Sequence, residues 1–271
     1  IIGRLVGSEM CIRDRVEAFK EALGDTLVGI YDKSAKTLLK NGGEASEDGW
    51  VWGSAPEGHF ATEHGHRFDI DWEKGQKTGF FLDQRENRAL LGSLSKGKKV
   101  LNVFSYTGGF SIYAMKAGAT EVHSLDSSQR ALDVCEDNVR LNELPVQSHT
   151  SIQADALEYL KADELGEYDI VVLDPPAFAK RASARHAAVQ GYKRINLRAL
   201  QGMKPGSLLF TFSCSQAVDD TLFANTIVAA AIQAGRTVRI LHRLHQPPDH
   251  PVNVFHPEGS YLKGLVVRVD D

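Results

Sequence analysis

The sequence is poor in cysteine and has no long hydrophobic run. Its 271 residues include three cysteines, Cys11, Cys135 and Cys214, whose spacing matches no metal site. Three thiols are too few for a disulfide framework, which favours a reducing cytoplasm. No apolar stretch approaches membrane-spanning length, and no charged start precedes an apolar stretch as in an export signal. The sequence therefore predicts a cytoplasmic protein without a metal or a membrane partner.

Acidic residues are absent from two long segments, although the net charge of the whole chain is only -4. The first segment runs from Pro175 to Val218 and the second from Thr221 to Pro248. The first contains the basic residues Lys180, Arg181, Arg185, Lys193, Arg194, Arg198 and Lys204. Local positive potential can attract a phosphate backbone even when the whole protein is acidic. The alternative is that these charges lie on the solvated faces of ordinary helices, and charge alone does not decide between the two.

The chain also lacks the full glycine pattern of a dinucleotide site. Residues 99–126 have the pattern of a strand, a glycine turn, a helix and a second strand that ends in Asp126. This is half of a doubly wound nucleotide fold, in which an acid after the second strand binds ribose hydroxyls. Because the turn holds only Gly108-Gly109, a pyrophosphate cannot approach it as NAD requires. A nucleoside without a diphosphate, such as S-adenosylmethionine, fits the pattern better.

Strands alternate with helices along most of the chain, which predicts an α/β fold with a parallel sheet. After Asp126, helical patterns are predicted at 128–141, 155–165, 182–203 and 218–235. The strands predicted in the same region are 146–153, 168–174, 207–215, 236–244 and 261–269. No helix separates the last two strands, so an antiparallel edge strand is expected there.

The N-terminal part differs from this pattern. The expected divisions are a non-native leader at 1–15, a small α+β accessory domain at 16–75 and the main domain at 76–271. The leader is inferred because GSEMCIRDR resembles a translated adapter sequence and the chain begins without Met.

Two local patterns in this part predict particular structures. The stretch 67–72 alternates strictly, which predicts a strand with Phe68, Ile70 and Trp72 on one face. A half-buried sheet face is favoured over stacking on RNA bases for these side chains. Asp83 and Glu86 have capping-box spacing, which predicts that Asp83 caps a helix.

Six motifs stand together in this chain: GQKTGFFLDQRENR, VLNVFSYTGGFS, SLDSS, DPPAF, TFSCS and DHPV with PEGSYLKG. In this order they resemble the bacterial large-subunit ribosomal RNA methyltransferases that form 5-methylcytosine, a class I S-adenosylmethionine-dependent group. The resemblance covers about residues 16–271. It implies a doubly wound seven-stranded class I methyltransferase sheet with an antiparallel last strand. It also implies a large-subunit ribosomal RNA partner. Members of the family generally have an N-terminal PUA domain, which is expected to be missing from this sequence, and the resemblance leaves open whether the protein forms a homodimer.

The same resemblance implies a set of residues that bind S-adenosylmethionine. They are Phe81, Gln84, Arg85, Phe104, Tyr106, Gly108, Asp126, Ser127, Asp155 and Ala156. Asp126 would accept hydrogen bonds from the ribose diol, Asp155 from the adenine amino group, and Arg85 could pair with the carboxylate of the amino-acid end. Each acid could instead cap a helix. Acids after three successive strands, Asp126, Asp155 and Asp174, favour the site.

Two residues are expected to carry the chemistry. Carbon 5 of cytosine is a poor nucleophile until a thiolate adds at carbon 6. Cys214 is the candidate because it follows a predicted sheet strand, whereas Cys135 lies in a helical pattern and suits the alternative of a small buried hydrophobe. Asp174 would hydrogen-bond the cytosine ring near N3 and the amino group. The sequence does not identify the base that removes the carbon 5 proton.

The residues expected to contact the substrate are Pro175, Pro176, Phe178, Lys180 and Arg181. DPPAF also resembles the motif of enzymes that methylate exocyclic amino groups, in which an aromatic such as Phe178 stacks on the base. Related guanine-N7 methyltransferases share the YTG and DPP motifs but tend to have Asn where Cys214 stands. A further alternative is an RNA-binding or assembly module without turnover.

Overall fold

The computed structural model describes residues 9–40, 47–56, 58, 60–77, 79–161, 163–179 and 181–271. The chain forms two compact units, a smaller one from residues 1–60 and 70–79 and a larger one from residues 61–69 and 80–271. Within the described residues, no helix is long and apolar enough to cross a membrane.

The smaller unit is an α+β arrangement around a two-stranded sheet. Its elements are α1 (Glu9–Leu23), η1 (Gly24–Thr26), β1 (Gly29–Asp32), α2 (Ala35–Lys40) and β2 (Gly49–Gly53). Strands β1 and β2 pair antiparallel, with Tyr31 opposite Trp50 and their rings in edge contact at 5.3 Å. The predicted leader boundary after Arg15 lies inside α1.

The strand predicted at 67–72 is wrong beyond its second residue. Strand β4 (His66–Phe68) ends at Phe68 and pairs with β3 (Ala61–Glu63) in the larger unit. After Phe68 the chain turns, because the Asp71 side chain accepts a hydrogen bond from Lys74 N at 2.8 Å and its carbonyl accepts one from Gly75 N. Ile70 and Trp72 therefore do not share a strand face with Phe68.

The larger unit contains a seven-stranded sheet, as predicted. Its strands are β5 (Lys99–Val103), β6 (Glu121–Asp126), β7 (His149–Gln153), β8 (Ile170–Leu173), β9 (Leu208–Ser213), β10 (Val238–His245) and β11 (Lys263–Val269). The order is β10-β11-β9-β8-β5-β6-β7, and β11 runs antiparallel to both of its neighbours. The antiparallel last strand is confirmed, but it is not at the edge. Since β11 enters between β10 and β9, both of its sides are paired, and all of its residues except Arg268 are buried.

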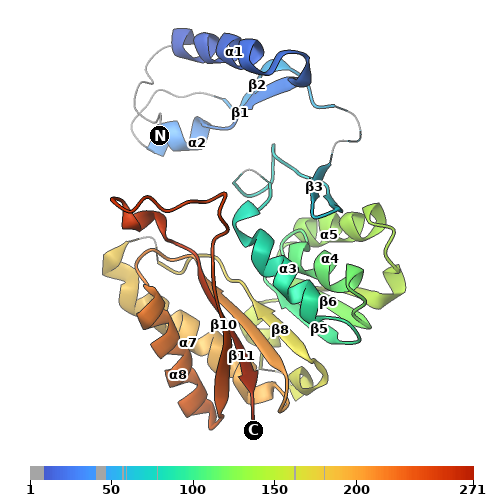
Figure 1. The fold of residues 1–271 in the computed structure, drawn as a ribbon, viewed down its shortest axis with the longest axis vertical. Coiled ribbons are helices and arrows are strands. Elements are labelled where there is room, and N and C mark those ends of the chain that lie inside the picture. Colours follow the sequence, from blue (N-terminus) through green and yellow to red (C-terminus); the bar gives the residue numbers. More distant parts are fainter. Residues whose placement is uncertain are drawn as a thin grey trace. The chain divides into compact units, whose positions relative to one another are not determined.

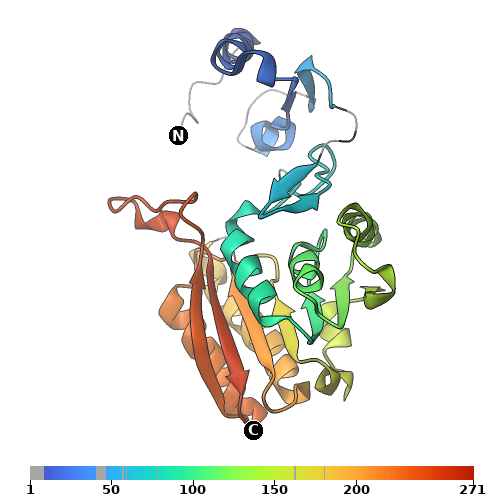
Figure 2. The ribbon, with the colours of Figure 1, turned by 45° about the vertical axis from the view of Figure 1, so that its right-hand side comes forward.

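Helices cover this sheet. They are α3 (Arg85–Leu94) after η2 (Leu82–Gln84), α4 (Gly109–Lys116), α5 (Gln129–Leu141), α6 (Ala156–Tyr159), α7 (Arg185–Gly202) and α8 (Asp220–Ala234). Short 3-10 turns are η3 (Val146–Ser148), η4 (Asp163–Glu167), η5 (Ala182–Ala184) and η6 (Pro257–Gly259). Helices α7 and α8 lie side by side in both ribbon views, at the end of the sheet that contains β10 and β11 (Figures 1 and 2).

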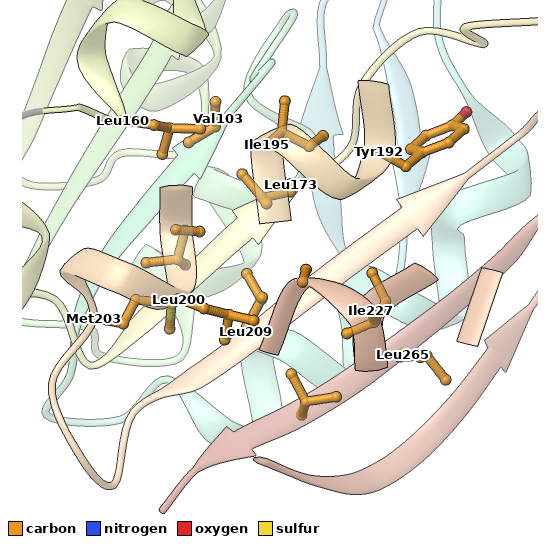
Figure 3. Close-up of a cluster of buried hydrophobic side chains, with 14 of the residues drawn as sticks. Val103, Leu160, Leu173, Tyr192, Ile195, Leu200, Met203, Leu209, Ile227 and Leu265 are labelled. Carbon is orange, nitrogen blue, oxygen red and sulfur yellow. The ribbon is translucent and has the colours of Figure 1, made fainter. Parts of the chain in front are cut away.

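The main core lies between these two helices and the sheet. Figure 3 shows Ile195 and Leu200 of α7 together with Leu173 of β8, Leu209 of β9 and Leu265 of β11. These side chains are fully or almost fully buried. Burying apolar surface is the main favourable term in folding, so this cluster holds the carboxyl ends of β8 and β9 in fixed positions.

Some predicted boundaries are wrong because local hydrogen bonds compete with the expected element. Residues 146–148 form η3 rather than a strand, since Ser148 N donates to Pro145 O at 2.9 Å. Asp83 does not cap α3. It lies inside η2 and accepts a hydrogen bond from the Tyr261 hydroxyl at 2.7 Å, while the N-cap position is Gln84.

Candidate active site

The expected site residues follow strands that end at the same level of the sheet. Val103 of β5 pairs with Leu125 of β6 and with Leu173 of β8, which in turn pairs with Thr211 of β9. The parallel strands β7, β6, β5, β8 and β9 thus present their carboxyl ends along one edge. The residues at these ends or just after them are Asp155, Asp126, Phe104, Asp174 and Cys214. This edge is where open α/β sheets bind ligands.

The turn between β5 and α4 has an unusual backbone. Phe104 and Tyr106 have positive φ angles of 60° and 48°. Residues other than glycine rarely adopt this backbone conformation. Ser105 N donates to Leu125 O at 3.0 Å, and Thr107 O accepts a bond from Asn138 at 2.9 Å. The surrounding contacts therefore hold the turn in a strained form, which is common where a ligand is bound.

Gly108 is required in this turn for packing. Its φ is 82°, and a Cβ atom there would lie 2.2 Å from Cys135 Sγ. Cys135 is fully buried in α5, and burial raises the pKa of its thiol to about 12. The expectation that Cys135 is a small buried hydrophobe is confirmed. The close approach at Gly108 is filled by this sulfur, so the structure gives Gly108 a packing role.

Asp126 is not a helix cap. Its Oδ2 accepts a hydrogen bond from Tyr106 N and its Oδ1 one from Ser128 N, both at 2.9 Å, while Ser128 itself caps α5. Each carboxylate oxygen can accept a second hydrogen bond. Asp126 is partly exposed, and the neighbouring Ser127 is exposed. Asp126 can therefore accept from two adjacent hydroxyl groups, the chemistry expected for a ribose diol.

Asp155, by contrast, does cap a helix. Its Oδ1 accepts hydrogen bonds from Leu157 N at 2.9 Å and Glu158 N at 3.0 Å, at the start of α6. The alternative reading of this acid as a cap is thus correct, and its proposed bond to adenine would have to use Oδ2. Ala156, the first residue of α6, is buried.

The segment before α3 contacts residues that follow both β5 and β8. The Phe81 ring is in edge contact with Tyr106 at 5.5 Å. Gln84 is buried and donates through Nε2 to Asp174 Oδ2 at 3.0 Å, while its Oε1 accepts from Asn87 at 2.7 Å. Gln84 is predicted as a cofactor contact. In the structure its hydrogen bond orients Asp174, which is predicted to contact the substrate base.

Arg85 pairs with two carboxylates of the protein. Its Nε lies 3.0 Å from Glu86 Oε1 and its Nη1 lies 2.6 Å from Asp249 Oδ2, in the segment between β10 and β11. The predicted pairing of Arg85 with the carboxylate of S-adenosylmethionine stays a prediction.

The DPPAF segment follows β8. Pro175 is buried and Pro176 is exposed. Phe178 is partly buried, with its ring 4.6 Å from that of Tyr192, and a Cβ atom at Gly191 would lie 2.9 Å from the Phe178 ring. Arg181 is exposed, and Lys180 lies outside the described residues. Much of the Phe178 ring is thus committed to packing on α7.

Cys214 is partly buried and lies between two buried serines at the end of β9. Ser215 Oγ accepts a hydrogen bond from Ala179 N at 3.2 Å and lies 3.1 Å from the Tyr192 hydroxyl. These bonds connect the Cys214 turn to the DPPAF segment and to α7. Lys263 adds two more, because its Nζ donates to Ser215 O and Val218 O, each at 2.7 Å.

Sequence reasoning missed Asn87, Tyr192 and Lys263. A signal existed for Lys263, since a lysine inside the apolar stretch YLKGLVVRV must be either exposed or specifically bonded. The others make contacts that sequence spacing does not reveal.

The basic residues of the acid-free segments have different roles. Arg181, Arg185 and Arg194 are exposed. Lys204 pairs with Asp169 at 2.9 Å, and Arg236 donates to Met203 O. The first three are therefore available to a polyanion, whereas the other two have partners within the protein. In the described part of the chain, no cluster of three or more His, Cys, Asp or Glu could hold a metal ion.

Comparison with known sequences identifies close relatives. A model of the S-adenosylmethionine-dependent methyltransferase family matches residues 38–268. A protein named ribosomal RNA large subunit methyltransferase I from Aeromonas salmonicida is 44% identical over 242 residues, which are 88% of this chain and 61% of that protein. A relative of the same name from Shewanella denitrificans is 43% identical over 244 residues, 89% of this chain and 61% of the relative. The chain thus spans about three fifths of the length of these curated relatives.

Solved structures share the fold of this chain. A candidate S-adenosylmethionine-dependent methyltransferase from Streptococcus mutans superposes with a TM-score of 0.79 at 26% identity, over 96% of this chain and 66% of that one. A second candidate methyltransferase, in complex with S-adenosylhomocysteine, superposes over the same shares with a TM-score of 0.80, also at 26% identity. The predicted class I fold is confirmed.

Proposed function

The chain belongs to the family of S-adenosylmethionine-dependent methyltransferases, and from this premise we propose that it methylates carbon 5 of a cytosine in large-subunit ribosomal RNA. The names of its relatives support the ribosomal RNA substrate. The observation that carries the finer assignment is a thiol, Cys214, at the same sheet edge as Asp126 and Asp174. Ribosomal RNA as the substrate supports a cytoplasmic location.

The residues at the β5 and β6 ends fit the cofactor. Asp126 has a free acceptor position on each oxygen for the ribose hydroxyls. In the adjacent turn, Ser105 Oγ is buried and has no hydrogen-bond partner among the described residues, so a ligand that changed this turn could satisfy it. Phe81 and Tyr106 offer aromatic surface beside Asp126. When bound, S-adenosylmethionine supplies an electrophilic methyl group.

Cys214 would activate the acceptor. The thiolate Sγ forms a bond to carbon 6 of cytosine, and the electron pair of the carbon 5–carbon 6 double bond moves to carbon 5 and the ring. Carbon 5 would then take the methyl group with its electron pair, while the bond between that methyl group and the sulfonium sulfur breaks and its electron pair stays on the sulfur. Loss of the carbon 5 proton to a base returns an electron pair to the ring, and the bond between Sγ and carbon 6 breaks.

Asp174 would orient the base during these steps. Its Oδ2 accepts a hydrogen bond from Gln84, which helps to orient the carboxyl group. A carboxylate can accept several hydrogen bonds, so a cytosine amino group is a suitable donor to it. A carboxyl group beside N3 also favours the protonated ring, which lowers the cost of adding a thiolate. Arg181 and Arg185, exposed after the DPPAF segment, would contact the RNA backbone.

Two observations favour this reaction over the alternatives. Direct methylation of an amino group needs Phe178 to stack on the base, and much of that ring packs on Gly191 and Tyr192. Neither amino-group nor guanine-N7 methylation uses a thiol, and both leave Cys214 without a role.

RNA that contains 5-fluorocytidine tests the thiol mechanism. Fluorine at carbon 5 cannot leave as a proton, so the methylated adduct cannot break down. With S-adenosylmethionine present, we expect a protein–RNA band that resists denaturation for the wild type and for a Cys135→Ser control, and none for Cys214→Ala. Absence of the band with wild type that methylates unmodified RNA, or full methylation by Cys214→Ala, would contradict the mechanism. A wild type that binds RNA without methylating it would indicate a non-catalytic module.

A further inference from the structure

We propose that Lys263 is a positioning residue for Cys214: its buried ammonium group holds the turn after the cysteine and supplies the positive charge that favours the thiolate. This inference rests on the proposed function, because the thiolate matters only if Cys214 is the nucleophile. It adds a residue that acts through Cys214 and does not itself need to touch the substrate.

The position of Lys263 follows from the sheet register. Lys263 is the first residue of β11 and pairs with Ser213, the last residue of β9 and the neighbour of Cys214. Only 4% of Lys263 is exposed. The ammonium group donates to Ser215 O and Val218 O, each at 2.7 Å. The lysine therefore spans the turn that begins at Cys214.

The bonding of this ammonium group is unusual for a buried charge. Within the described residues its hydrogen-bond partners are the two neutral carbonyl groups, and no carboxylate pairs with it. A buried charge without a counter-ion is costly, and burial lowers the pKa of Lys263. A structural link to two carbonyls does not need a charge, because a neutral donor could serve. A nearby negative charge gives the ammonium group a reason to be there.

Cys214 can provide that negative charge. Among the nearby charges, Asp220 at the start of α8 raises the pKa of Lys263 most, followed by a thiolate at Cys214 and then by Asp219. Coulombic interaction is reciprocal, so the lysine stabilises the thiolate by the same amount. Asp219 and Asp220 oppose this effect because they are negative.

Two tyrosines on neighbouring elements also interact with a charge at Cys214. They are Tyr192 from α7 and Tyr261 just before β11. Burial is the main cause that raises the pKa of both, and a thiolate at Cys214 raises it further. Their hydroxyl groups are engaged, with Ser215 Oγ at 3.1 Å and with Asp83 Oδ2 at 2.7 Å. Lys263 differs from these two tyrosines because its side chain can carry a positive charge.

The test is the pH dependence of Cys214 alkylation by iodoacetamide, measured without RNA by peptide mass spectrometry. Only the thiolate reacts, so the pH of half-maximal rate reports its formation. We expect Lys263→Met to move this pH upward by about one unit, which is about a tenfold slower reaction below the midpoint. Lys263→Arg should retain most of the wild-type behaviour, because it keeps the charge. Lys204→Met is the matched control. It also removes a lysine, but Lys204 lies before the start of β9 and pairs with Asp169.

A purely structural lysine would give a different result. Equal midpoints for wild type and a folded Lys263→Met would overturn the proposal, even if thermal stability fell. If Lys263→Met does not fold, wild type is compared with wild type unfolded in urea. A lower midpoint in the folded protein supports the proposal, and an equal or higher one overturns it.

A failure of the Lys263 proposal can be distinguished from a failure of the proposed function. If wild type forms 5-methylcytosine while the midpoints are equal, only the inference about Lys263 is wrong. If wild type forms none, the proposed reaction is wrong whatever the alkylation shows.

Discussion

Asp126 and Asp155 are the same residue type at the same kind of position, yet they make different bonds. One carboxylate oxygen of Asp155 accepts hydrogen bonds from two backbone amides of α6. In Asp126 each carboxylate oxygen accepts one hydrogen bond, and Ser128 caps α5. Position after a strand therefore does not determine what an acid does. The distribution of its hydrogen bonds does, and it favours Asp126 as the ribose ligand.

Replacing Asp126 should weaken cofactor binding. Asp126→Asn removes the charge and one acceptor, and hydrogen bonds to charged groups contribute about 1.5–3 kcal/mol each. We expect the Kd of S-adenosylmethionine, measured by titration calorimetry, to rise about tenfold to a hundredfold. Asp133→Asn, at an exposed position in α5, is the control and should bind like wild type. Unchanged affinity in Asp126→Asn would remove Asp126 from the site.

At the scale of elements, hydrophobic periodicity predicted the strands and helices that build the sheet. The buried strands β5, β6, β8 and β9 and the long helices α5, α7 and α8 lie where the pattern indicates. The errors occur where a few polar contacts decide the backbone, as in the turn after Phe68 and in η3.

The candidate site divides in the same way. Asp126, Asp174 and Cys214 could be found because each follows a strand, and the carboxyl ends of parallel strands share an edge. Lys263 could not be assigned, because its bonds to Ser215 and Val218 depend on β11 entering between β10 and β9. The sequence alone predicted an antiparallel edge strand within the last pair of strands, and its pattern does not show which of the two pairs with β9.

A buried ion pair between Glu63 and Arg88 connects the β3–β4 hairpin to α3 in the larger unit. Glu63, at the end of β3, accepts hydrogen bonds from Arg88 of α3 at 2.9 Å and 2.7 Å, and from the Tyr113 hydroxyl at 3.0 Å. Both charged side chains are buried, at 7% and 2% exposed. Burial and the Glu63 charge raise the pKa of Tyr113 above its usual range. The pair connects the β3–β4 hairpin to the helix that carries Asn87.

Breaking this pair should destabilise the protein strongly. Arg88→Met leaves Glu63 buried and unpaired, which costs about 3–5 kcal/mol in the free energy of unfolding. The double variant Glu63→Gln with Arg88→Met should recover part of that loss. Arg140→Met, whose partners Glu136 and Asp137 are exposed, should cost less than about 1 kcal/mol. Urea denaturation measures all three, and a similar loss for Arg88→Met and Arg140→Met would contradict the assigned role.

At the scale of the whole molecule, the larger unit contains every described residue of the proposed site. These residues run from Phe81 in the segment before α3 to Lys263 in β11, all within 80–271. The family model extends over 38–268, and the relatives are longer than this chain. We therefore expect that methyl transfer to ribosomal RNA can be measured with this chain.

The most direct test follows the hydrogen atom at carbon 5. A large-subunit ribosomal RNA transcript labelled with tritium at carbon 5 of cytosine is incubated with the protein and S-adenosylmethionine, and tritium in water is counted against methyl groups incorporated. The account predicts one tritium released for each methyl group, because carbon 5 loses its proton when the Cys214 adduct breaks down. Methyl incorporation without tritium release, or no incorporation into the RNA, would contradict it.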